Sequence, residues 1–478
     1  MTIDHRRLTR LTDRRTWVNR TTVGVAVATA WFVIVLLIGP EGNLTAPASR
    51  MLAIFGAAVV LWITEAIPLS ATSILVILAE ILLISDEALV GLPSNFEPPT
   101  YQSIFATLAN PVLILFLGGF VLAETAAKYR LDRNLAGVLL RPFGKSPRAI
   151  VAGLMMITAV LSMFVSNTAT TAAMMAVVIP VAAGLAPGDR LRVGLILSVP
   201  IAANVGGLGT PVGSPPNAIA LGRLQDQGIQ VDFVTWMALA VPVALVVLVF
   251  AWFVLVKRFP ASADTIDVRI GGEFDRGRPA LILYVVFALT VIGWVSEPLH
   301  GVPSAVVGFA AVVVLLSTQV FGVDDLRRLN WHILWLVGGG IALGNGVSST
   351  GLDQWLVKLF DWGSLSPGVL LAALALVAIG LSTIISNSAT ANLLIPIGIS
   401  LALSDAVDLD PLLVGLVIAL SCSLAMALPV STPPNAVAYA SGEIETKDMA
   451  IIGLLVGAVG IVLVVFVMPP IWNGLGLL

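Results

Sequence analysis

Two short polar clusters lie in the middle of long, uncharged and strongly apolar stretches of the sequence. They read S-N-T-A-T over 166–170 and S-N-S-A-T over 386–390. Hydroxyl and amide groups are costly in an apolar environment unless they find hydrogen-bond partners or a ligand. Two nearly identical clusters in such a setting predict the two halves of one binding site.

A second paired motif predicts helices that are interrupted inside the membrane. S-P-P-N over 214–217 follows a glycine-rich stretch, and T-P-P-N over 432–435 follows L-P-V-S. Glycine and proline at this density disfavour a continuous helix. Ser or Thr directly before proline is typical of a helix start, since the hydroxyl caps free N–H groups and proline fits the first turn. We therefore expect new half-helices to begin at Ser214 and at Thr432.

These helix ends suit an anion together with a small cation. If Ser166-Asn167 and Ser386-Asn387 cap returning helices, half-helix N-termini with free N–H groups gather at mid-depth and favour an anion. Carbonyl, hydroxyl and amide oxygens at the broken ends suit a hard monovalent cation such as Na⁺. Neither the clusters nor the breaks contain Lys, Arg, Asp or Glu. A bound dianion would meet no fixed positive charge, so we expect co-bound cations to neutralise it.

The composition places these motifs in a membrane protein. Hydrophobic residues make up 58% of the 478 and charged residues only 11%, whereas roughly a quarter of a soluble domain is charged. The chain is therefore predicted to be an all-α polytopic membrane protein. Its single cysteine, Cys422, excludes an intrachain disulfide, a cysteine-based zinc site and an iron–sulfur cluster. The three histidines are scattered, and neither an organic cofactor nor a nucleic-acid partner is expected.

Uncharged windows of about 20 residues, the length that crosses a bilayer, recur along the chain and predict about 11 transmembrane helices. Two further windows, 149–188 and 366–404, are about twice that length, and each carries one polar cluster at its centre. One straight helix of that length would be too long for the hydrocarbon core, so each window is predicted to be a re-entrant hairpin. The single-span windows lie near 22–39, 51–68, 66–84, 101–123, 193–222, 232–256, 279–297, 303–320, 331–350, 409–440 and 449–470.

The chain is also duplicated. The polar clusters and the breaks recur in the same order, as do W-I-T-E (62–65) with W-V-S-E (294–297) and L-G-G (117–119) with V-G-G (337–339). Each copy has an odd number of predicted crossings, which places the copies in opposite orientations. Inverted repeats with interrupted helices are typical of secondary transporters, whose site lies at the repeat interface.

The basic residues orient this arrangement. Of the 25 Lys and Arg residues, all but Arg50, Arg223 and Lys358 fall in segments that share one side if the N-terminus is cytoplasmic. The positive-inside rule makes that side cytoplasmic and places the C-terminus outside. The predicted segments are a basic N-terminus at 1–20, a first span at 22–39, repeat 1 over 51–256 with its hairpin at 149–188 and its broken helix at 193–230, a cytoplasmic linker at 257–278, and repeat 2 over 279–470 with its hairpin at 366–404 and its broken helix at 409–442.

Two features of the chain allow an alternative interpretation. Each hairpin arm is long enough to cross the membrane, so the polar clusters could be turns at the membrane surface. Their lack of charge and their pairing with the breaks argue against this.

Glu65 and Glu80 are the only carboxylates placed within spans, and either could carry a proton. Glu65 has a repeat mate, Glu297, which favours a structural role, whereas Glu80 has none and its role stays open.

The paired tips, the paired breaks and W-I-T-E-A-I-P (62–68) together resemble the divalent anion/sodium symporter family, relatives of the animal sodium–dicarboxylate and citrate carriers. The resemblance covers nearly the whole chain after residue 20. It implies a homodimer in which a transport domain moves against a scaffold domain by an elevator mechanism. It also implies C4-dicarboxylates, citrate or, in some branches, sulfate as substrate.

The resemblance also implies roles for individual residues. A first sodium site would use Ser162, Ser166, Asn167 and the loop around Gly213, and a second would use Ser382, Ser386, Asn387 and the loop around Ser431. The substrate would meet Ser166, Asn167, Thr168, Ser386, Asn387, Ser388, Ser214, Pro215, Thr432 and Pro433. Thr168 and Ser388 hold the same position in the two tips. Many dicarboxylate carriers of the family have Thr in both tips, whereas Ser388 keeps the hydroxyl and lacks the methyl group, so this position bears on which substrate is bound.

The predicted function is sodium-coupled symport of a C4-dicarboxylate (succinate, malate or fumarate) or of citrate, in a bacterial plasma membrane. A sodium-independent dicarboxylate exchanger and a sodium/sulfate symporter are the alternatives. An anion channel could use the same helix ends, although inverted repeats favour a carrier. An enzyme is not expected, because the spans contain no nucleophile–base pair and no cluster of metal ligands.

Overall fold

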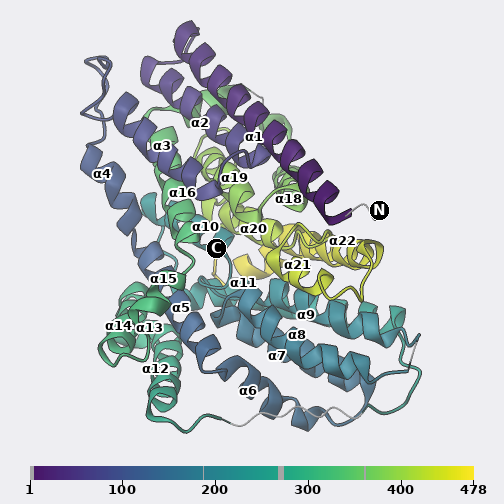
Figure 1. Cartoon of the computed structure of the whole chain (residues 1–478). Helices are drawn as coiled ribbons and strands as arrows, with labels where there is room; N and C mark the ends of the chain where they lie inside the picture. Colours follow the sequence, from purple (N-terminus) through teal and green to yellow (C-terminus); the bar gives the residue numbers. More distant parts are fainter. Residues whose placement is uncertain (1–4, 187, 267–273, 360–361) are drawn as a thin grey trace. The chain divides into compact units, whose positions relative to one another are not determined.

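The computed structural model describes residues 5–186, 188–266, 274–359 and 362–478, and every regular element in these ranges is helical (Figure 1). The predicted all-α fold is therefore confirmed. The chain divides into two compact units. Unit 1 comprises Met1–Asn110, Trp331–Ser364 and Ser400–Val407, and unit 2 comprises Pro111–Asn330, Leu365–Ile399 and Asp408–Leu478.

Unit 1 is built on α1, α2, α3 and α16. Helix α1 packs along α2 through Ala28 and Leu61, and α3 packs between α2 and α16. A Cβ added at Gly339 of α16 would overlap Ser73 of α3, so this glycine allows the two helices to approach closely. The helices are α1 (His5–Ile38), α2 (Ala46–Thr64), α3 (Leu69–Ile84), α4 (Tyr101–Ala106), α16 (Trp331–Ser349) and α17 (Leu352–Lys358), with 3₁₀ turns at Thr107–Ala109 and Trp362–Ser364.

Unit 2 contains most of the remaining helices, including both predicted hairpins and both predicted breaks. Its elements are α5 (Pro111–Lys128), α6 (Leu131–Leu139), a 3₁₀ turn (Arg141–Phe143), α7 (Pro147–Phe164), α8 (Asn167–Ala183), α9 (Leu191–Gly206), α10 (Pro215–Asp226), α11 (Phe233–Arg258), α12 (Arg278–Val295), α13 (Glu297–His300), α14 (Ser304–Ser317), α15 (Val323–Arg328), α18 (Pro367–Ile384), α19 (Asn387–Ala402, whose last residues fall in unit 1), α20 (Pro411–Ser423), α21 (Pro433–Tyr439), α22 (Thr446–Val462), a π-helical turn (Leu463–Val467) and α23 (Met468–Gly474).

The repeated tryptophan motif has the same structural role in each unit. Trp62 is fully buried, and its indole N–H donates to the carbonyl of Leu69, at the start of the next helix, at 3.1 Å. Trp294 is also fully buried and donates to the carbonyl of Ser304 at 2.9 Å, while its ring stacks on Phe233. Trp62 therefore fixes the connection from α2 to α3, and Trp294 fixes the connection from α12 to α14, with the short α13 between them. Glu65 ends α2 in the left-handed conformation and is exposed, whereas Glu297 is the first residue of α13.

Ion pairs join segments that the charge pattern assigns to one side of the membrane. Arg258 pairs with Asp448 at 3.2 Å, and Lys128 pairs with Asp325 at 2.6 Å. Burial would raise the pKa of Asp325, but hydrogen bonds from the Gly322 N–H and from Lys128, together with the Lys128 charge, hold that pKa below its usual value. The pairs thus join the ends of α11 and α22 and the ends of α5 and α15.

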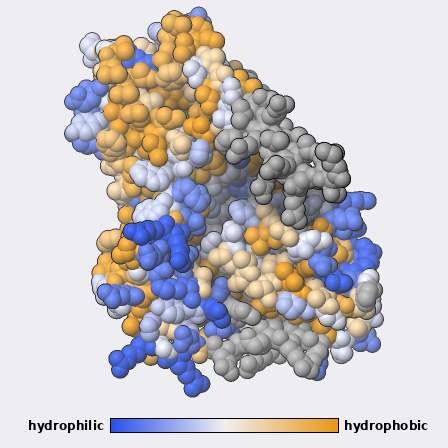
Figure 2. Space-filling view, in the orientation of Figure 1, coloured by the Kyte–Doolittle hydropathy of each residue, from blue (hydrophilic) through white to orange (hydrophobic). Residues whose placement is uncertain are grey.

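Among the described residues, eight helical segments are long and apolar enough to cross a membrane, or nine if the bent pair α16–α17 counts as one span. The uncharged windows of the sequence predict more spans than this, because such a window does not show how long the helix inside it is. Five apolar helices have only 10–17 residues each: α3, α8, α9, α14 and α20. Helices α9 and α20 are short because each ends at a break. Apolar side chains cover much of the face on which α2 and α3 lie (Figure 2), and Ile74, Leu75 and Leu78 of α3 are among the exposed ones.

A tight helix contact gives a test of this packing. A Cβ added at Gly206, the last residue of α9, would overlap the backbone of Ala159 in α7. Overpacking a well-packed site costs about 1–3 kcal/mol, so Gly206→Ala should lower the melting temperature of the purified protein. The matched control is Gly380→Ala in α18, where nothing lies within 4 Å of the added Cβ. Equal melting temperatures for the two variants would contradict the contact.

Candidate functional site

Both predicted hairpins bend at the polar clusters, and they do so in the same way. Helix α7 ends at Phe164, Val165 is extended, and α8 begins at Asn167 with Ser166 as its N-cap. Helix α18 ends at Ile384, Ile385 is extended, and α19 begins at Asn387. In each tip the serine, the asparagine and the third residue, Thr168 or Ser388, are half-buried. The two tips thus present the same three positions from the same backbone geometry.

The predicted helix starts after the breaks are confirmed. Helix α10 begins at Pro215 with Ser214 as its extended N-cap, and α21 begins at Pro433 with Thr432 in that role. Thr432 accepts a hydrogen bond from the Asn435 N–H at 3.3 Å, as a capping hydroxyl does. Ser214 makes no such bond, and its hydroxyl lies 3.0 Å from that of Ser423.

The asparagine of each S/T-P-P-N motif supports the broken backbone. The Asn217 amide donates to the carbonyls of Gly207 at 2.9 Å and Thr210 at 2.8 Å. The Asn435 amide donates to the carbonyls of Met426 at 2.8 Å and Leu428 at 3.0 Å. A helix break leaves carbonyls without partners, which is costly in an apolar environment, and these buried amides satisfy some of them. Sequence reasoning gave the two asparagines no role, although their repetition in both motifs was a signal.

Each break is also fixed to its own hairpin. The Thr210 hydroxyl donates to the carbonyl of Met163, three residues before Ser166. The Ser431 hydroxyl donates to the carbonyl of Thr383, three residues before Ser386, at 3.0 Å. The two carbonyls hold equivalent positions in the repeats. The loop of each broken helix therefore lies against the tip of the hairpin that precedes it.

The two repeats meet through reciprocal hydrogen bonds. The Asn204 amide, on the last turn of α9, donates to the Thr432 hydroxyl and to the Asn435 amide oxygen, both at 3.1 Å. In the other direction, Ser423 at the end of α20 pairs with Ser214 at 3.0 Å. Each N-cap is thus held by a side chain of the opposite repeat. Neither Asn204 nor Ser423 was predicted, because neither belongs to a repeated motif.

Oxygen atoms converge at the first predicted sodium site. The Asn167 Oδ1 lies 2.5 Å from the hydroxyl of fully buried Ser162, and the same amide atom lies 3.1 Å from the Gly213 carbonyl and 3.2 Å from that of Ser162. The Ser162 hydroxyl also lies 2.8 Å from the carbonyl of Ala203. With its amide turned over, which is the assignment that the surrounding groups favour, Asn167 donates its N–H groups to three of these oxygens. Four oxygens, those of Ser162 (hydroxyl and carbonyl), Gly213 and Ala203, then remain around the amide, and oxygens of this kind are the ligands that a hard cation takes.

A glycine keeps this space open. A Cβ added at Gly207 would overlap the Asn167 amide and would lie 3.0 Å from the Gly213 carbonyl. The loop after α9 can therefore wrap closely around the amide only because it carries no side chain here.

The second predicted sodium site contains buried oxygens. The Oδ1 of Asn387 has no hydrogen-bond partner among the described residues, and the hydroxyl of fully buried Ser382 lies within hydrogen-bonding reach of the Cys422 thiol. The Ser431 hydroxyl donates to the Thr383 carbonyl and accepts from the Leu428 N–H at 3.2 Å, which leaves one lone pair on its oxygen. These oxygens also suit a cation.

Helix starts beside these oxygens suit an anion. The N-cap Ser166 makes no side-chain cap bond, so the first N–H groups of α8 receive no hydroxyl from their own cap. Helix α10 begins with two prolines, which have no N–H, and its first N–H group, that of Asn217, donates to the Ser214 carbonyl. Among the hydrogen bonds of the described residues, none joins the tip at 166–168 directly to the tip at 386–388. The structure connects the two halves through α9, α10, α20 and α21 instead.

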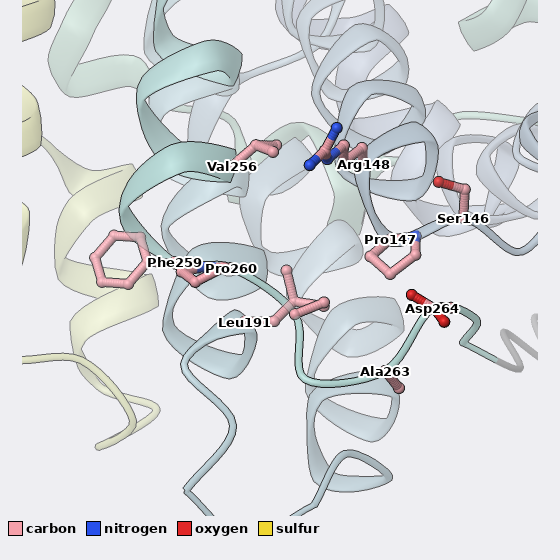
Figure 3. A pocket seen from close by; sticks show the side chains of 10 residues that line it. Ser146, Pro147, Arg148, Leu191, Val256, Phe259, Pro260, Ala263 and Asp264 are labelled. Carbon is pink, nitrogen blue, oxygen red and sulfur yellow. The ribbon is translucent and has the colours of Figure 1, made fainter.

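A separate cavity of about 310 Å³ lies where α7 begins and α11 ends (Figure 3). Arg148 and Asp264 are on its walls together with Leu191 and Phe259. No predicted site residue lines it, so it is not part of the candidate site.

Comparisons with known proteins agree with this arrangement. A family model described as the sodium:sulfate symporter transmembrane region matches residues 19–478. The sodium-dependent dicarboxylate transporter SdcS of Staphylococcus saprophyticus is 31% identical to the chain, and the match covers 94% of this chain and 92% of the relative. SdcS of Staphylococcus aureus strain USA300 is 30% identical, over 95% of this chain and 92% of the relative.

Two solved membrane transporters share the fold at low sequence identity. The Alcanivorax borkumensis YdaH transporter has a TM-score of 0.56 at 15% identity, covering 86% of this chain and 99% of its own. Neisseria gonorrhoeae MtrF has a TM-score of 0.52 at 11% identity, covering 91% and 96%. At these identities the likeness concerns the fold alone. Because the family model spans nearly the whole chain, the protein belongs to the sodium:sulfate symporter group, that is, to the divalent anion/sodium symporter family.

Proposed function

We propose that the protein is a secondary transporter that couples the uptake of a C4-dicarboxylate to Na⁺. The observation that carries this proposal is the set of oxygens around Asn167 at the start of α8, whose N-cap Ser166 makes no side-chain cap bond, together with the buried Oδ1 of Asn387 at the equivalent position of the second repeat. The names of the SdcS relatives, sodium-dependent dicarboxylate transporters, support the same ion and substrate class.

In this proposal the cation sites and the anion site depend on each other. Na⁺ would bind at Ser162, Asn167 and Gly213, and at Ser382, Asn387 and Ser431. Each ion orders the tip on which it binds, so the first-turn N–H groups of α8 and α19 face the substrate. The hydroxyls of Thr168 and Ser388 add further polar contacts. Since the two tips and the two breaks carry no charged side chain, the bound cations supply the positive charge that a dianion needs.

The twofold character of the site favours a dicarboxylate over sulfate. Each repeat supplies one tip and one S/T-P start, so the two carboxylates of one substrate can each meet one repeat. Sulfate concentrates its charge on a single centre and would engage the two halves less evenly. Citrate remains a second candidate because it offers the same pair of end carboxylates.

The proposal includes an elevator motion, a homodimer and a location in the bacterial plasma membrane, with the N-terminus cytoplasmic. All of the predicted site residues belong to unit 2, as a site that moves as one body requires. Much of the visible surface is apolar (Figure 2), which supports a position in lipid.

Uptake measurements test the coupling. Labelled succinate should accumulate in proteoliposomes along an inward Na⁺ gradient, saturate with concentration, and fall to background when choline replaces Na⁺. Collapse of the gradient with a sodium ionophore should have the same effect. Uptake that ignores Na⁺ and instead requires internal succinate would replace symport by exchange.

Replacing the tip amides tests the site. Asn167→Ala and Asn387→Ala each remove an amide oxygen from a predicted cation site, so each should lower Na⁺-driven succinate uptake to near background while the protein still purifies as a stable, folded species. Asn95→Ala, in an exposed loop, is the control and should transport normally. Near-normal uptake by both tip variants would refute the assignment.

A further inference from the structure

Glu80 is a buried acid that the proposed transport site does not use. It lies in α3, within unit 1, and only 1% of its surface is exposed. Its Oε1 is buried and has no hydrogen-bond partner among the described residues. An ionised carboxylate in such a place is strongly disfavoured unless an opposite charge or a proton neutralises it.

The protein side chains packed around Glu80 do not supply that charge. A Cβ added at Gly346 of α16 would lie 2.6 Å from Glu80 Oε1 and 2.9 Å from the sulfur of Met51, so the carboxyl lies against that glycine. Met51 offers no charge. Arg50 precedes Met51 in α2 and is basic. Its guanidinium donates hydrogen bonds of 2.7–2.9 Å to the backbone carbonyls of Leu83, Val90 and Gly91.

A small cavity adjoins the carboxyl. Its volume is about 110 Å³, and its walls combine the polar residues Glu80, Ser103, Thr107, Asn345 and Ser349 with apolar ones. A space of this volume is large enough for an ion with a water molecule. All of the lining residues belong to unit 1.

The hydroxyl groups on these walls present oxygens rather than hydrogens. Ser103 donates to the carbonyl of Thr100 at 2.7 Å, and Thr107 donates to that of Ile104 at 2.7 Å. Ser349 donates to the carbonyl of Gly346 at 3.3 Å. A hydroxyl whose hydrogen is used in this way keeps its oxygen lone pairs as acceptors. A carboxylate that shares a cavity with such acceptors is stabilised when a cation lies between them.

We infer that this cavity is a Na⁺ site of unit 1, with Glu80 as its charged ligand and the hydroxyl oxygens of Ser103, Thr107 and Ser349 as neutral ligands. A single carboxylate balances a single positive charge, which selects a monovalent ion. A proton on Glu80 would use one acceptor and leave the other oxygens of the cavity without a ligand, whereas Na⁺ uses several. The ion is resident and stabilises unit 1, because none of its ligands belongs to the transport site in unit 2.

Sodium-dependent melting of the purified full-length protein tests this site without measuring transport. The background is the Asn167→Ala/Asn387→Ala double variant, which disables both proposed transport sites. Replacing choline by Na⁺ should still raise its melting temperature, and adding Glu80→Gln should abolish that rise. Glu87→Gln, at an exposed position just after α3, is the matched control and should leave the rise unchanged.

A second variant covers the case in which Glu80→Gln does not fold. Thr107→Val keeps the side-chain shape and removes one oxygen ligand, so the Na⁺ concentration that gives the half-maximal shift should increase about tenfold. Three results would overturn the inference. The first is a double variant whose melting temperature does not rise with Na⁺, and the second is an unchanged rise after Glu80→Gln or Thr107→Val. The third is a Glu80→Gln variant that melts higher than its background, when lowering the pH, but not adding Na⁺, raises the melting temperature of that background by the same amount. A failure of succinate transport would leave this readout unaffected.

Discussion

The side-chain amides of Asn217 and Asn435 make the hydrogen bonds on which the rest of the site depends. A chain that stops being helical inside a membrane frees carbonyl groups that lipid cannot satisfy. Each amide donates to two or more of these carbonyls, so the breaks after α9 and α20 are stable features of the fold. Because the two prolines and the capping hydroxyl precede the same asparagine, four consecutive residues both restart the helix and support the loop before it.

Stable breaks have consequences for the whole site. They place Thr210 and Ser431 where each binds its own hairpin, and they let Asn204 and Ser423 join the two repeats. The result is a set of helix starts and oxygens without a charged side chain. Such a site holds neither a cation nor a dianion well by itself, because each would keep its full charge in an apolar environment. Binding both together removes that cost, and this mutual dependence is the physical basis of the proposed coupling.

Sequence patterns predicted the features that depend on backbone chemistry. Proline and glycine fix where helices stop and start, so the helix starts after Ser214 and Thr432 were foreseen. The bends at 166 and 386 were foreseen because each uncharged window is too long for one span and carries a polar cluster at its centre. The contacts of Asn204 and Ser423 were not, because one polar residue in an apolar run does not reveal its partner in a distant segment. The number of complete spans also differed, since an uncharged window does not show where a helix within it ends. Glu80 was visible as an intramembrane acid, but only the structure shows the cavity and the oxygens beside it.

The central claim is that the two repeats form one site for a cation-neutralised dicarboxylate. A cryo-electron microscopy structure of the full-length protein in Na⁺ and succinate, compared with one in choline without succinate, tests it most directly. We predict succinate density between the two tips, with one carboxylate at the start of α8 and the other at the start of α19, and an ion enclosed by Ser162, Asn167 and Gly213. Succinate bound at only one repeat, or away from both tips, would contradict the account.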